Sequence, residues 1–289
     1  MADTPSQPEP LEPLMAELDA LETPEAIEGQ EPGNGAEPDG KPVIVFKHVS
    51  IAFGDHVVLR NVSFSVKRGQ TLCILGRSGV GKSVSLRLLM GFLKPDSGSI
   101  YVDGQEITCL DEEGLRAIRQ RVTMVFQNGA LFDSLSVREN VAFPLRERGG
   151  LSDEQVDDLV NRLISLVGAE DVVEELPASL STGRKRAVAM ARALAAQPEI
   201  VLYDEPTTMV DPLIARRLGS LIQRLKKQLG FTSIVVTHDM RFAESLADTV
   251  LFLDNAQACF FGPLQGFLAS PNPQIREFLK LDEYVLPLA

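Results

Sequence analysis

The sequence predicts an α/β fold: a mostly parallel sheet flanked by helices, with an antiparallel β subdomain and an inserted helical subdomain. Three observations lead to this prediction. Short apolar runs alternate with helical segments, which is typical of parallel strands covered on both faces. Two strand-like runs at the start of the folded part are split by a turn signal. A charged, amphipathic and mostly helical stretch, residues 136–196, interrupts the series of apolar runs.

The expected elements follow in order from residue 42. Residues 43–49 and 57–66 are expected to be strands of the antiparallel subdomain, joined at the turn signal Gly54-Asp55. Further strands are expected at residues 71–75, 99–102, 122–127, 200–203, 233–237 and 249–253 and around Phe260. Helices are expected at about 82–92, 212–229 and 275–281, and within 136–196, where Gly149-Gly150 and Pro177 mark breaks.

Charge divides the chain into an acidic leader and a nearly neutral body. Residues 1–40 hold eleven of the 40 acidic residues, no Lys or Arg, and seven of the 18 prolines, which leaves 29 acidic against 28 basic residues for the rest. Such a segment cannot bury enough apolar surface to offset its ordering entropy. Residues 1–41 are therefore predicted to be a disordered leader, or alternatively a partner-binding arm. Residues 42–262 form the predicted main domain, with its helical subdomain at about 129–196, and residues 263–289 a C-terminal extension.

Composition also narrows the function classes. No stretch of about 18 apolar residues occurs, so no membrane-spanning helix is expected. The body lacks a basic stripe, so no nucleic-acid partner is expected. Cys73, Cys109 and Cys259 are far apart and odd in number, which favours reduced thiols in a cytosolic protein. The three histidines have no metal-ligand spacing.

A glycine-rich loop between the expected strand 71–75 and the expected helix 82–92 fits the phosphate-loop pattern G-x-x-x-x-G-K-[ST]. Its residues are Gly76, Arg77, Ser78, Gly79, Val80, Gly81, Lys82 and Ser83. Glycines let the backbone wrap a phosphate with its N–H groups, and the helix that follows offers its positive end. Lys82 is expected to reach the β- and γ-phosphates, and the Ser83 hydroxyl to hold Mg²⁺. The motif thus predicts binding of ATP with Mg²⁺.

An apolar run at residues 200–203 ends in the acid pair Asp204-Glu205. Unpaired carboxylates at the end of a buried strand are costly, which makes sense where a cation binds. Asp204 is therefore predicted to hold Mg²⁺, directly or through water. Glu205 is predicted to polarise a water molecule against the γ-phosphate. The acid pair alone is a weak signal, because loops at strand ends often carry acids, but it is strong beside a phosphate loop.

Between these two motifs lies the segment Leu180-Ser181-Thr182-Gly183-Arg184, followed by the helical run 185–196. Ser181 is a good N-cap residue, and a helix start with Ser and Gly also makes a second anion site. With this segment the chain resembles the ABC (ATP-binding cassette) ATPase family, whose signature L-S-G-G-Q stands at this place. The resemblance covers roughly residues 43–262, with every motif in the family's order, and implies a P-loop NTPase-like fold.

The resemblance also implies roles for residues that are unremarkable alone. Gln127 matches the Q-loop glutamine that contacts Mg²⁺, Asp211 the D-loop aspartate, His238 the switch histidine at the γ-phosphate, and Phe53 the aromatic residue that stacks on adenine. Taken singly, such a histidine usually lies in a turn, and such a phenylalanine in a core. The implied catalytic residues are Glu205, His238, Gln127 and Lys82. The implied Mg²⁺ ligands are Ser83, Gln127 and Asp204. The implied nucleotide contacts are Phe53, residues 76–83, Ser181, Gly183 and Asp211, with Ser181 and Gly183 acting on the nucleotide of a second copy.

The sequence departs from the family pattern at two places. The first place is the signature segment, where Thr182 stands for a glycine of the family and Arg184 for a glutamine. The second is the D-loop, where Met209-Val210 replaces the common Gly-Leu before Asp211. A β-branched residue tolerates helical dihedral angles, so Thr182 is acceptable if it lies in the first turn of a helix. These changes bear on hydrolysis rate and dimer fit, not on nucleotide binding.

Residues 125–145 read V-F-Q-N-G-A-L-F-D-S-L-S-V-R-E-N-V-A-F-P-L. This stretch, and the tail around residues 270–279, resemble the ATPases of the Mla (maintenance of lipid asymmetry) and Mkl type, which serve bacterial phospholipid transporters. The resemblance implies a homodimer at the cytoplasmic face of the inner membrane, with an integral-membrane permease and an MCE-domain protein as partners.

Two other functions stay open at this point. One is an ABC ATPase for another cargo, such as a polar solute or an organic solvent. The other is a soluble ABC protein of translation or DNA repair. It is disfavoured because the chain has a single cassette and residues 136–196 are too short for a long coiled-coil insert.

Overall fold

The computed structural model describes residues 40–283, without the side chains of Gln228, Asp282 and Glu283. By its contacts the chain divides into residues 1–35 and residues 36–289, and everything described below belongs to the second unit. The predicted leader, residues 1–41, lies outside the described residues except for its last two positions. Regular structure begins directly afterwards, at Pro42.

The larger sheet of the described residues has six strands in the order β10-β9-β3-β8-β7-β6. They are β3 (Thr71–Leu75), β6 (Val122–Val125), β7 (Ile200–Asp204), β8 (Thr232–Val236), β9 (Thr249–Asp254) and β10 (Gln257–Pro263). All neighbours run parallel except β10, which is antiparallel to β9. Every residue of β3, β7 and β8 is buried. Burial on both faces explains why these strands are mostly apolar in the sequence.

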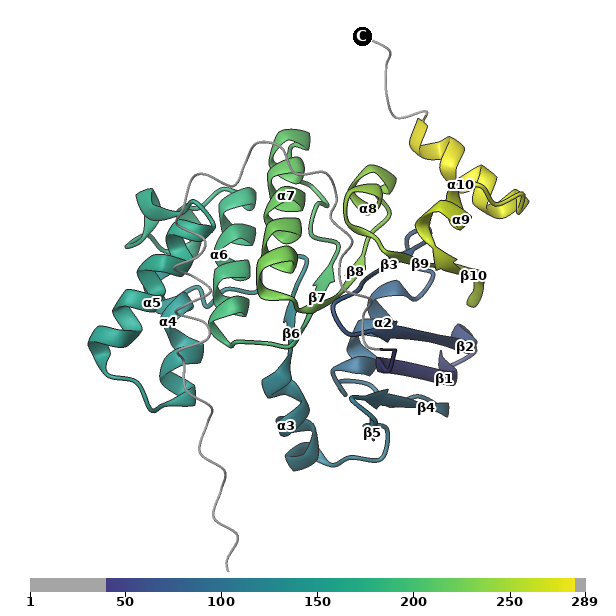
Figure 1. The fold of residues 1–289 in the computed structure, drawn as a ribbon, viewed down its shortest axis with the longest axis horizontal. Coiled ribbons are helices and arrows are strands. Elements are labelled where there is room, and N and C mark those ends of the chain that lie inside the picture. Colours follow the sequence, from purple (N-terminus) through teal and green to yellow (C-terminus); the bar gives the residue numbers. More distant parts are fainter. Residues whose placement is uncertain (1–39, 284–289) are drawn as a thin grey trace, which may run out of the picture. The chain divides into compact units, whose positions relative to one another are not determined.

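A smaller antiparallel sheet flanks the larger one, and its strands come both before and after β3 in the chain (Figure 1). Its order in the described residues is β2-β1-β4-β5, from β1 (Pro42–Phe53), β2 (His56–Lys67), β4 (Ser97–Val102) and β5 (Gln105–Glu106). The turn Gly54-Asp55 closes the β1–β2 hairpin and sets Phe53 opposite His56. The predicted antiparallel subdomain is thus present.

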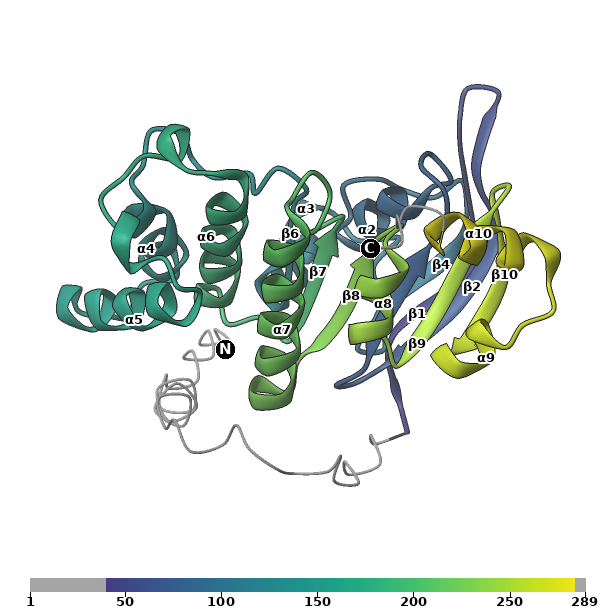
Figure 2. The same cartoon turned by 90° about the horizontal axis from the view of Figure 1, so that it is seen from above.

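Helices cover both faces of the larger sheet (Figures 1 and 2). On one face lie α2 (Lys82–Leu89) and α3 (Glu112–Arg121), and on the other α7 (Pro212–Leu229) and α8 (Met240–Leu246). Beside β6, a group of helices forms the inserted helical part: α4 (Val137–Arg148), α5 (Asp153–Leu166) and α6 (Thr182–Ala195), with the short turns η2 (Glu170–Val172) and η3 (Pro177–Ser179). The chain then continues past β10 into α9 (Leu264–Leu268) and α10 (Pro273–Glu283).

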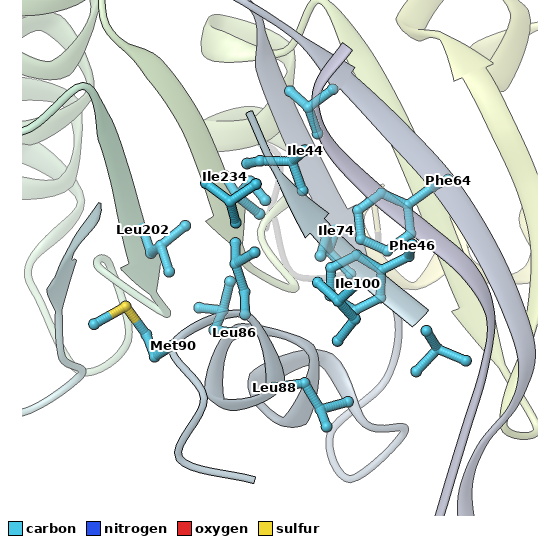
Figure 3. Packing of buried hydrophobic residues seen from close by; sticks show 14 of the residues in the cluster. Ile44, Phe46, Phe64, Ile74, Leu86, Leu88, Met90, Ile100, Leu202 and Ile234 are labelled. Carbon is cyan, nitrogen blue, oxygen red and sulfur yellow. The ribbon is translucent and has the colours of Figure 1, made fainter. Parts of the chain in front are cut away.

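A hydrophobic core lies where the two sheets and α2 meet (Figure 3). Leu86 of α2 is fully buried there with Ile74 and Ile234 of the larger sheet. Phe46 and Phe64 of the smaller sheet stack with ring centroids 4.4 Å apart. Each fully buried side chain of this kind contributes about 1.5–3 kcal/mol. This packing holds the first residues of α2, and with them the glycine-rich loop, against the sheet.

The fold class predicted from the sequence is confirmed, and the differences concern single elements. The expected helix 82–92 ends at Leu89, and the expected strand 122–127 ends at Val125. Helix α3 was not predicted, because only Leu115 and Ile118 of its ten residues are buried and the apolar pattern is too sparse. The short elements β5, α8 and α9 were also missed.

Two further predictions can be compared with the described part of the chain. Cys73, Cys109 and Cys259 are free thiols. Among residues 40–283, no helix is both long enough and apolar enough to cross a membrane.

Candidate functional site

Four loops meet at one edge of the larger sheet because they follow four neighbouring parallel strands. The glycine-rich loop 76–83 follows β3, His238 follows β8, Glu205 follows β7 and Gln127 follows β6. Since the carboxyl ends of parallel strands lie at the same edge, residues far apart in the sequence come together here. This is the usual place for a ligand in an open α/β sheet.

These loops enclose a pocket of about 390 Å³. The residues that line it are His56, Val58, Ser78, Gly79, Gly81, Lys82, Ser83, Val84, Gln127, Glu205, Thr208 and His238. The structure therefore brings most of the phosphate loop together with all four residues predicted to be catalytic. Gly81, at the start of α2, has φ +98°, and a Cβ there would lie 2.8 Å from the carbonyl oxygen of Val58. Any other residue at this position would bring its Cβ too close to the backbone of β2, so the position requires glycine.

Lys82 is buried at the centre of the pocket, with 5% of its surface exposed. Its Nζ donates hydrogen bonds to the carbonyl oxygens of Gly76 at 2.9 Å and Arg77 at 3.0 Å. The same atom lies 3.4 Å from Oε1 of Glu205. A buried ammonium group needs such partners, because an isolated charge is costly to desolvate. The loop thus supplies Lys82 with carbonyl ligands that a phosphate could replace.

Glu205 is held in place by its neighbours. Its Oε2 lies 2.8 Å from Nδ1 of His238 and accepts a hydrogen bond of 3.0 Å from the Thr208 hydroxyl. Burial opposes ionisation of the carboxyl group most strongly, yet the hydrogen bond with His238 and the charge of Lys82 lower its pKa overall. The hydrogen bond with Glu205 likewise raises the pKa of His238. Glu205 is thus an ionised carboxylate at neutral pH, facing the pocket.

Asp204 and Ser83 form a second polar pair, in which the Ser83 hydroxyl donates to Oδ1 of Asp204 at 2.6 Å. Burial raises the pKa of Asp204, and the hydrogen bond from Ser83 opposes this shift. Within residues 40–283 no basic side chain pairs directly with Asp204, so this buried carboxylate lacks a cation. A hydroxyl and a carboxylate oxygen are ligands that Mg²⁺ accepts, with water and phosphate completing its shell. The residues present therefore fit this ion, with Gln127 at the pocket wall as a further oxygen donor.

Four predicted nucleotide contacts, Phe53, Gly76, Arg77 and Val80, lie outside the pocket lining formed by the described residues. Phe53 is 49% exposed, and it stands opposite His56, which does line the pocket, in the β1–β2 register. The Arg77 guanidinium turns towards α10 and pairs with Glu277 at 2.6 Å. Val80 packs against the core instead. Of these, Phe53 shares a sheet face with His56, because directly opposed residues of antiparallel strands point the same way.

Ser181 and Asp211 also lie outside the pocket, and each begins a helix. The Ser181 hydroxyl accepts from the backbone N–H of Arg184 and caps α6. The Asp211 carboxylate accepts from the backbone N–H of Leu213 and caps α7. Capping satisfies backbone donors that a helix start leaves unpaired. Within one chain, both residues therefore have a structural role and no contact with the pocket.

Gly183 explains how closely α6 and α7 approach. It is buried, and a Cβ at this position would lie 2.8 Å from Cγ2 of Ile214. Thr182 is the first residue of α6, where a β-branched residue meets no backbone restriction. Arg184, the other departure from the family signature, bonds to Asp171 at 2.8 Å and to the carbonyl of Gly168. Arg184 therefore links the start of α6 to the segment after α5 by an ion pair and a hydrogen bond.

Five residues that shape the site were not predicted from the sequence. His56, Val58, Val84 and Thr208 line the pocket, and Arg186 donates to three backbone carbonyls just after β7. Thr208 lies three residues after Glu205 and could have been proposed as its hydrogen-bond partner. No sequence signal separates Arg186 from the basic residues beside it.

A glycine loop that encloses a lysine, next to an acid pair on a nearby parallel strand, defines a P-loop nucleotide-binding protein. The ABC transporter family model matches residues 59–208 of the chain. This range holds the glycine loop, Gln127, the signature segment and Glu205. The chain belongs to the ABC transporter family and carries its ATP-binding domain. ATP and Mg²⁺, the ligands predicted from the sequence, are those that cassettes of this family bind.

Two groups of relatives share more than a third of the matched residues. The methionine import ATP-binding protein MetN of Brucella abortus is 39% identical over 236 residues, which cover 82% of this chain and 64% of the relative. The chain thus spans about two thirds of the length of MetN. The intermembrane phospholipid transport system ATP-binding protein MlaF of Escherichia coli is 36% identical over 237 residues, covering 82% of this chain and 88% of the relative.

Solved ABC cassettes have the same fold. A dimeric post-hydrolysis state of the ATP-binding cassette MJ0796, bound to ADP and Pi, has a TM-score of 0.71 at 31% identity and covers 76% of this chain and 98% of its own. The cbiO1 protein of Clostridium perfringens, part of the ABC transporter complex cbiONQ, has a TM-score of 0.73 at 27% identity, covering 85% and 96%.

Proposed function

We propose that the chain is the ATP-hydrolysing subunit of an ABC transporter, working as a homodimer that drives a separate integral-membrane permease. One observation carries the proposal: Lys82, Glu205 and His238 converge in one pocket beside the pair Ser83–Asp204. A phosphate-binding cation, an ionised carboxylate and an imidazole are the groups that phosphoryl transfer to water requires.

The phosphate loop binds the triphosphate by exchange of partners. Lys82 leaves the carbonyl oxygens of Gly76 and Arg77 and donates to the β- and γ-phosphates, while loop N–H groups and the start of α2 face the same anion. Ser83, Asp204 and Gln127 would hold the Mg²⁺ ion, which would neutralise phosphate charge. Because Lys82 loses its contact with Glu205 in this exchange, the carboxylate becomes free to act on water.

Glu205 orients the attacking water and accepts its proton. Its lowered pKa keeps the carboxylate ionised at neutral pH, and Thr208 and His238 fix its direction. His238 is half exposed at the mouth of the pocket, where its imidazole can donate to the γ-phosphate. Catalysis is therefore positioning and charge stabilisation, without a covalent intermediate.

A second copy of the chain completes the site. Ser181 and Gly183 lie at the start of α6, outside their own pocket, so a contact with nucleotide requires the pocket of a partner. Two apolar side chains flank Asp211 at the surface: Met209 is 90% exposed and Leu213 is also exposed. An exposed apolar pair at a helix start suits burial between copies. The dimeric MJ0796 cassette bound to ADP and Pi supports this arrangement.

A permease helix would dock on the aromatic surface next to Gln127. Phe132 and Phe143 are exposed and pack as a tilted pair with ring centroids 4.8 Å apart, and the guanidinium of Arg192 lies 5.4 Å from the Phe132 ring centroid. An amphipathic helix binds such a surface through its apolar face. Docking at this surface keeps the chain peripheral, at the cytoplasmic face of the inner membrane.

The favoured cargo is phospholipid, moved by a system that includes an MCE-domain protein. The resemblance of residues 125–145 to Mla-type ATPases and the 36% identity with MlaF support this proposal. Methionine or another small solute is the second candidate, because MetN is 39% identical over a similar stretch. Purification of the complex from membranes separates the two. An MCE-domain subunit is expected to copurify, and a permease of the amino-acid type in its place would contradict the phospholipid proposal.

Replacement of Lys82 by Ala tests the nucleotide pocket itself. Loss of a buried, charge-assisted hydrogen-bond donor is expected to weaken ATP binding by roughly ten- to a hundredfold. Equilibrium binding of a fluorescent ATP analogue to the full chain measures this change. Lys47→Ala is the matched control, because Lys47 lies on β1 in contact with the Tyr101 ring. Equal affinity in both variants would remove the assigned site.

A further inference from the structure

Arg186 is a buried cation that lacks a carboxylate contact. It lies one turn into α6 and is 4% exposed. Within the described part of the chain it forms no ion pair, and burial lowers its pKa. A buried charge is costly unless hydrogen bonds compensate it. The hydrogen-bond acceptors of this guanidinium therefore indicate its structural role.

All three of its hydrogen bonds go to one short backbone segment. Nη1 donates to the carbonyl oxygens of Glu205, at 3.0 Å, and of Pro206, and Nη2 donates to that of Thr208. This segment carries the carboxylate that lines the pocket and the hydroxyl that orients it. Glu205 has φ +48°, a backbone conformation that non-glycine residues rarely adopt and that persists only where the surroundings fix it.

The segment is fixed from two sides. The backbone N–H of Glu205 donates to the carbonyl of Val236 on β8 at 2.9 Å, so the sheet holds one side of the peptide. Arg186 of α6 holds the other side through the carbonyls. The helix that contributes Arg186 begins at Ser181–Gly183, the residues proposed to meet the nucleotide of a second copy.

We infer that Arg186 is a positioning residue that sets the backbone of Glu205 and transmits the position of the start of α6 to that carboxylate. This inference rests on the proposed function and extends it. One guanidinium couples two events: docking of the signature segment on a partner's nucleotide, and activation of water in the chain's own pocket. A planar fork reaches several carbonyls at fixed angles, whereas the ammonium group of lysine is a single point. Replacement by lysine keeps the positive charge and most of the aliphatic side chain, but not the planar arrangement of several donors.

Arg186→Lys in the full chain, purified with its partner subunits, tests the inference. Turnover is expected to fall about tenfold or more, while ATP affinity changes less than about twofold, because a misplaced carboxylate affects the reaction and not the binding of phosphate. Arg119→Lys is the matched control. Arg119 also donates to a backbone carbonyl, that of Met90 at 3.0 Å, but far from the pocket, and its replacement is expected to leave turnover unchanged. Thermal unfolding of both variants shows whether each is folded.

A double-variant cycle separates positioning of Glu205 from any other effect on activity. In the Glu205→Gln background, Arg186→Lys is expected to change the single-turnover rate less than about twofold, because its target is already absent. The same fold-loss in both backgrounds, or wild-type turnover in Arg186→Lys alone, would overturn the inference and leave the proposed function standing. If the unaltered complex hydrolyses no ATP, the proposed function fails, and this inference fails with it.

Discussion

Strand β7 has a glutamate at each end, and the two have different surroundings. Glu199 stands directly before the strand and Glu205 directly after it. Glu199 belongs to a four-membered ion cluster in which Arg68 and Arg121 each bridge it to Asp103. Glu205 has one ammonium at 3.4 Å, one imidazole at 2.8 Å and an open pocket in front of it.

The ion cluster at Glu199 is complete, and it joins parts of the chain that are distant in sequence. Arg68 follows β2, Asp103 follows β4, Arg121 ends α3, and Glu199 precedes β7. Hydrogen bonds with Arg121, followed by those with Arg68, lower the pKa of Glu199 to about 2 against the opposing effect of burial. Each of the four charged groups pairs with two groups of opposite charge. No carboxylate of the cluster is therefore left to bind a ligand at this end of the strand.

The comparison shows that pairing, not residue type, decides which carboxylate can take part in chemistry. Both glutamates are ionised at neutral pH, but Glu199 is held by two guanidinium groups, which keep their charge. The cations at Glu205 are a lysine that phosphate can draw away and a histidine. Contact with Glu205 raises the pKa of this histidine above its ordinary value, but its imidazole, unlike a guanidinium, can lose its proton. The account therefore predicts that one acid supports stability and the other activity.

The largest expected effect comes from Glu205→Gln. Turnover is expected to fall by roughly 10²–10⁴-fold, because a general base is removed, while ATP binding persists. Glu199→Gln, the matched control on the same strand, is expected to hydrolyse ATP within about twofold of the unaltered chain. Steady-state phosphate release from the full chain and its partner subunits measures both. Comparable losses in the two variants would show that the ends of β7 are not functionally distinct.

For the free energy of unfolding, we expect the larger effect from the Glu199 variant and not from the Glu205 variant. Glu199→Gln should lower the free energy of unfolding by about 1–2 kcal/mol at neutral pH, a modest loss because solvent screens a cluster that is more than a third exposed. The pKa of Glu199 is lower in the folded chain than its ordinary value of 4.5, so this contribution is fully present above that pH. It is lost as pH falls towards about 2. Denaturant unfolding at pH 7 and pH 3 checks this: a difference between variant and parent that does not shrink with acid would contradict it.

The pKa of His238 provides a smaller but more local test. Contact with Glu205 raises it above the ordinary value of 6.5, so Glu205→Gln should lower it. The charged pair of His238 and Glu205 therefore stabilises the fold below pH 6.5, and this contribution disappears as pH rises through the folded pKa of His238. NMR titration of the imidazole without nucleotide measures the shift. An unchanged pKa would mean that the two side chains do not interact.

The smallest expected effect concerns the exposed pair Arg77–Glu277, which joins the glycine loop to α10. Most of the surface of both side chains is accessible to solvent, and such pairs contribute about 0–1 kcal/mol. Glu277→Gln is expected to change ATP affinity less than about twofold. A tenfold change would show that α10 controls the loop and that exposure is a poor guide to function in this chain.

Much of the site could be predicted because its motifs follow buried strands. The segments before Gly76, Gln127, Glu205 and His238 are short and mostly apolar, and parallel strands align their carboxyl ends. Phe53 was predicted from family resemblance and not from this strand pattern. Its role as an adenine contact stays a prediction, and the structure places it opposite His56, which lines the pocket.

Contacts made by side chains across the fold could not be predicted. In the sequence Arg186 looks like any basic residue of a helix, and its three carbonyl partners, in the segment after β7, are brought to it only when the chain folds and α6 packs beside β6. The cluster around Glu199 is equally hidden, because its four members come from four separate elements. Local patterns predict strands and loops, whereas long-range polar contacts depend on the completed fold.

The decisive experiment is a structure of the Glu205→Gln chain with ATP and Mg²⁺. We expect the triphosphate in the pocket between the glycine loop and residues 205 and 238, with Nζ of Lys82 moved from the carbonyl of Gly76 to the phosphates. A nucleotide bound elsewhere, or a Lys82 still bonded to Gly76 beside a bound triphosphate, would contradict it.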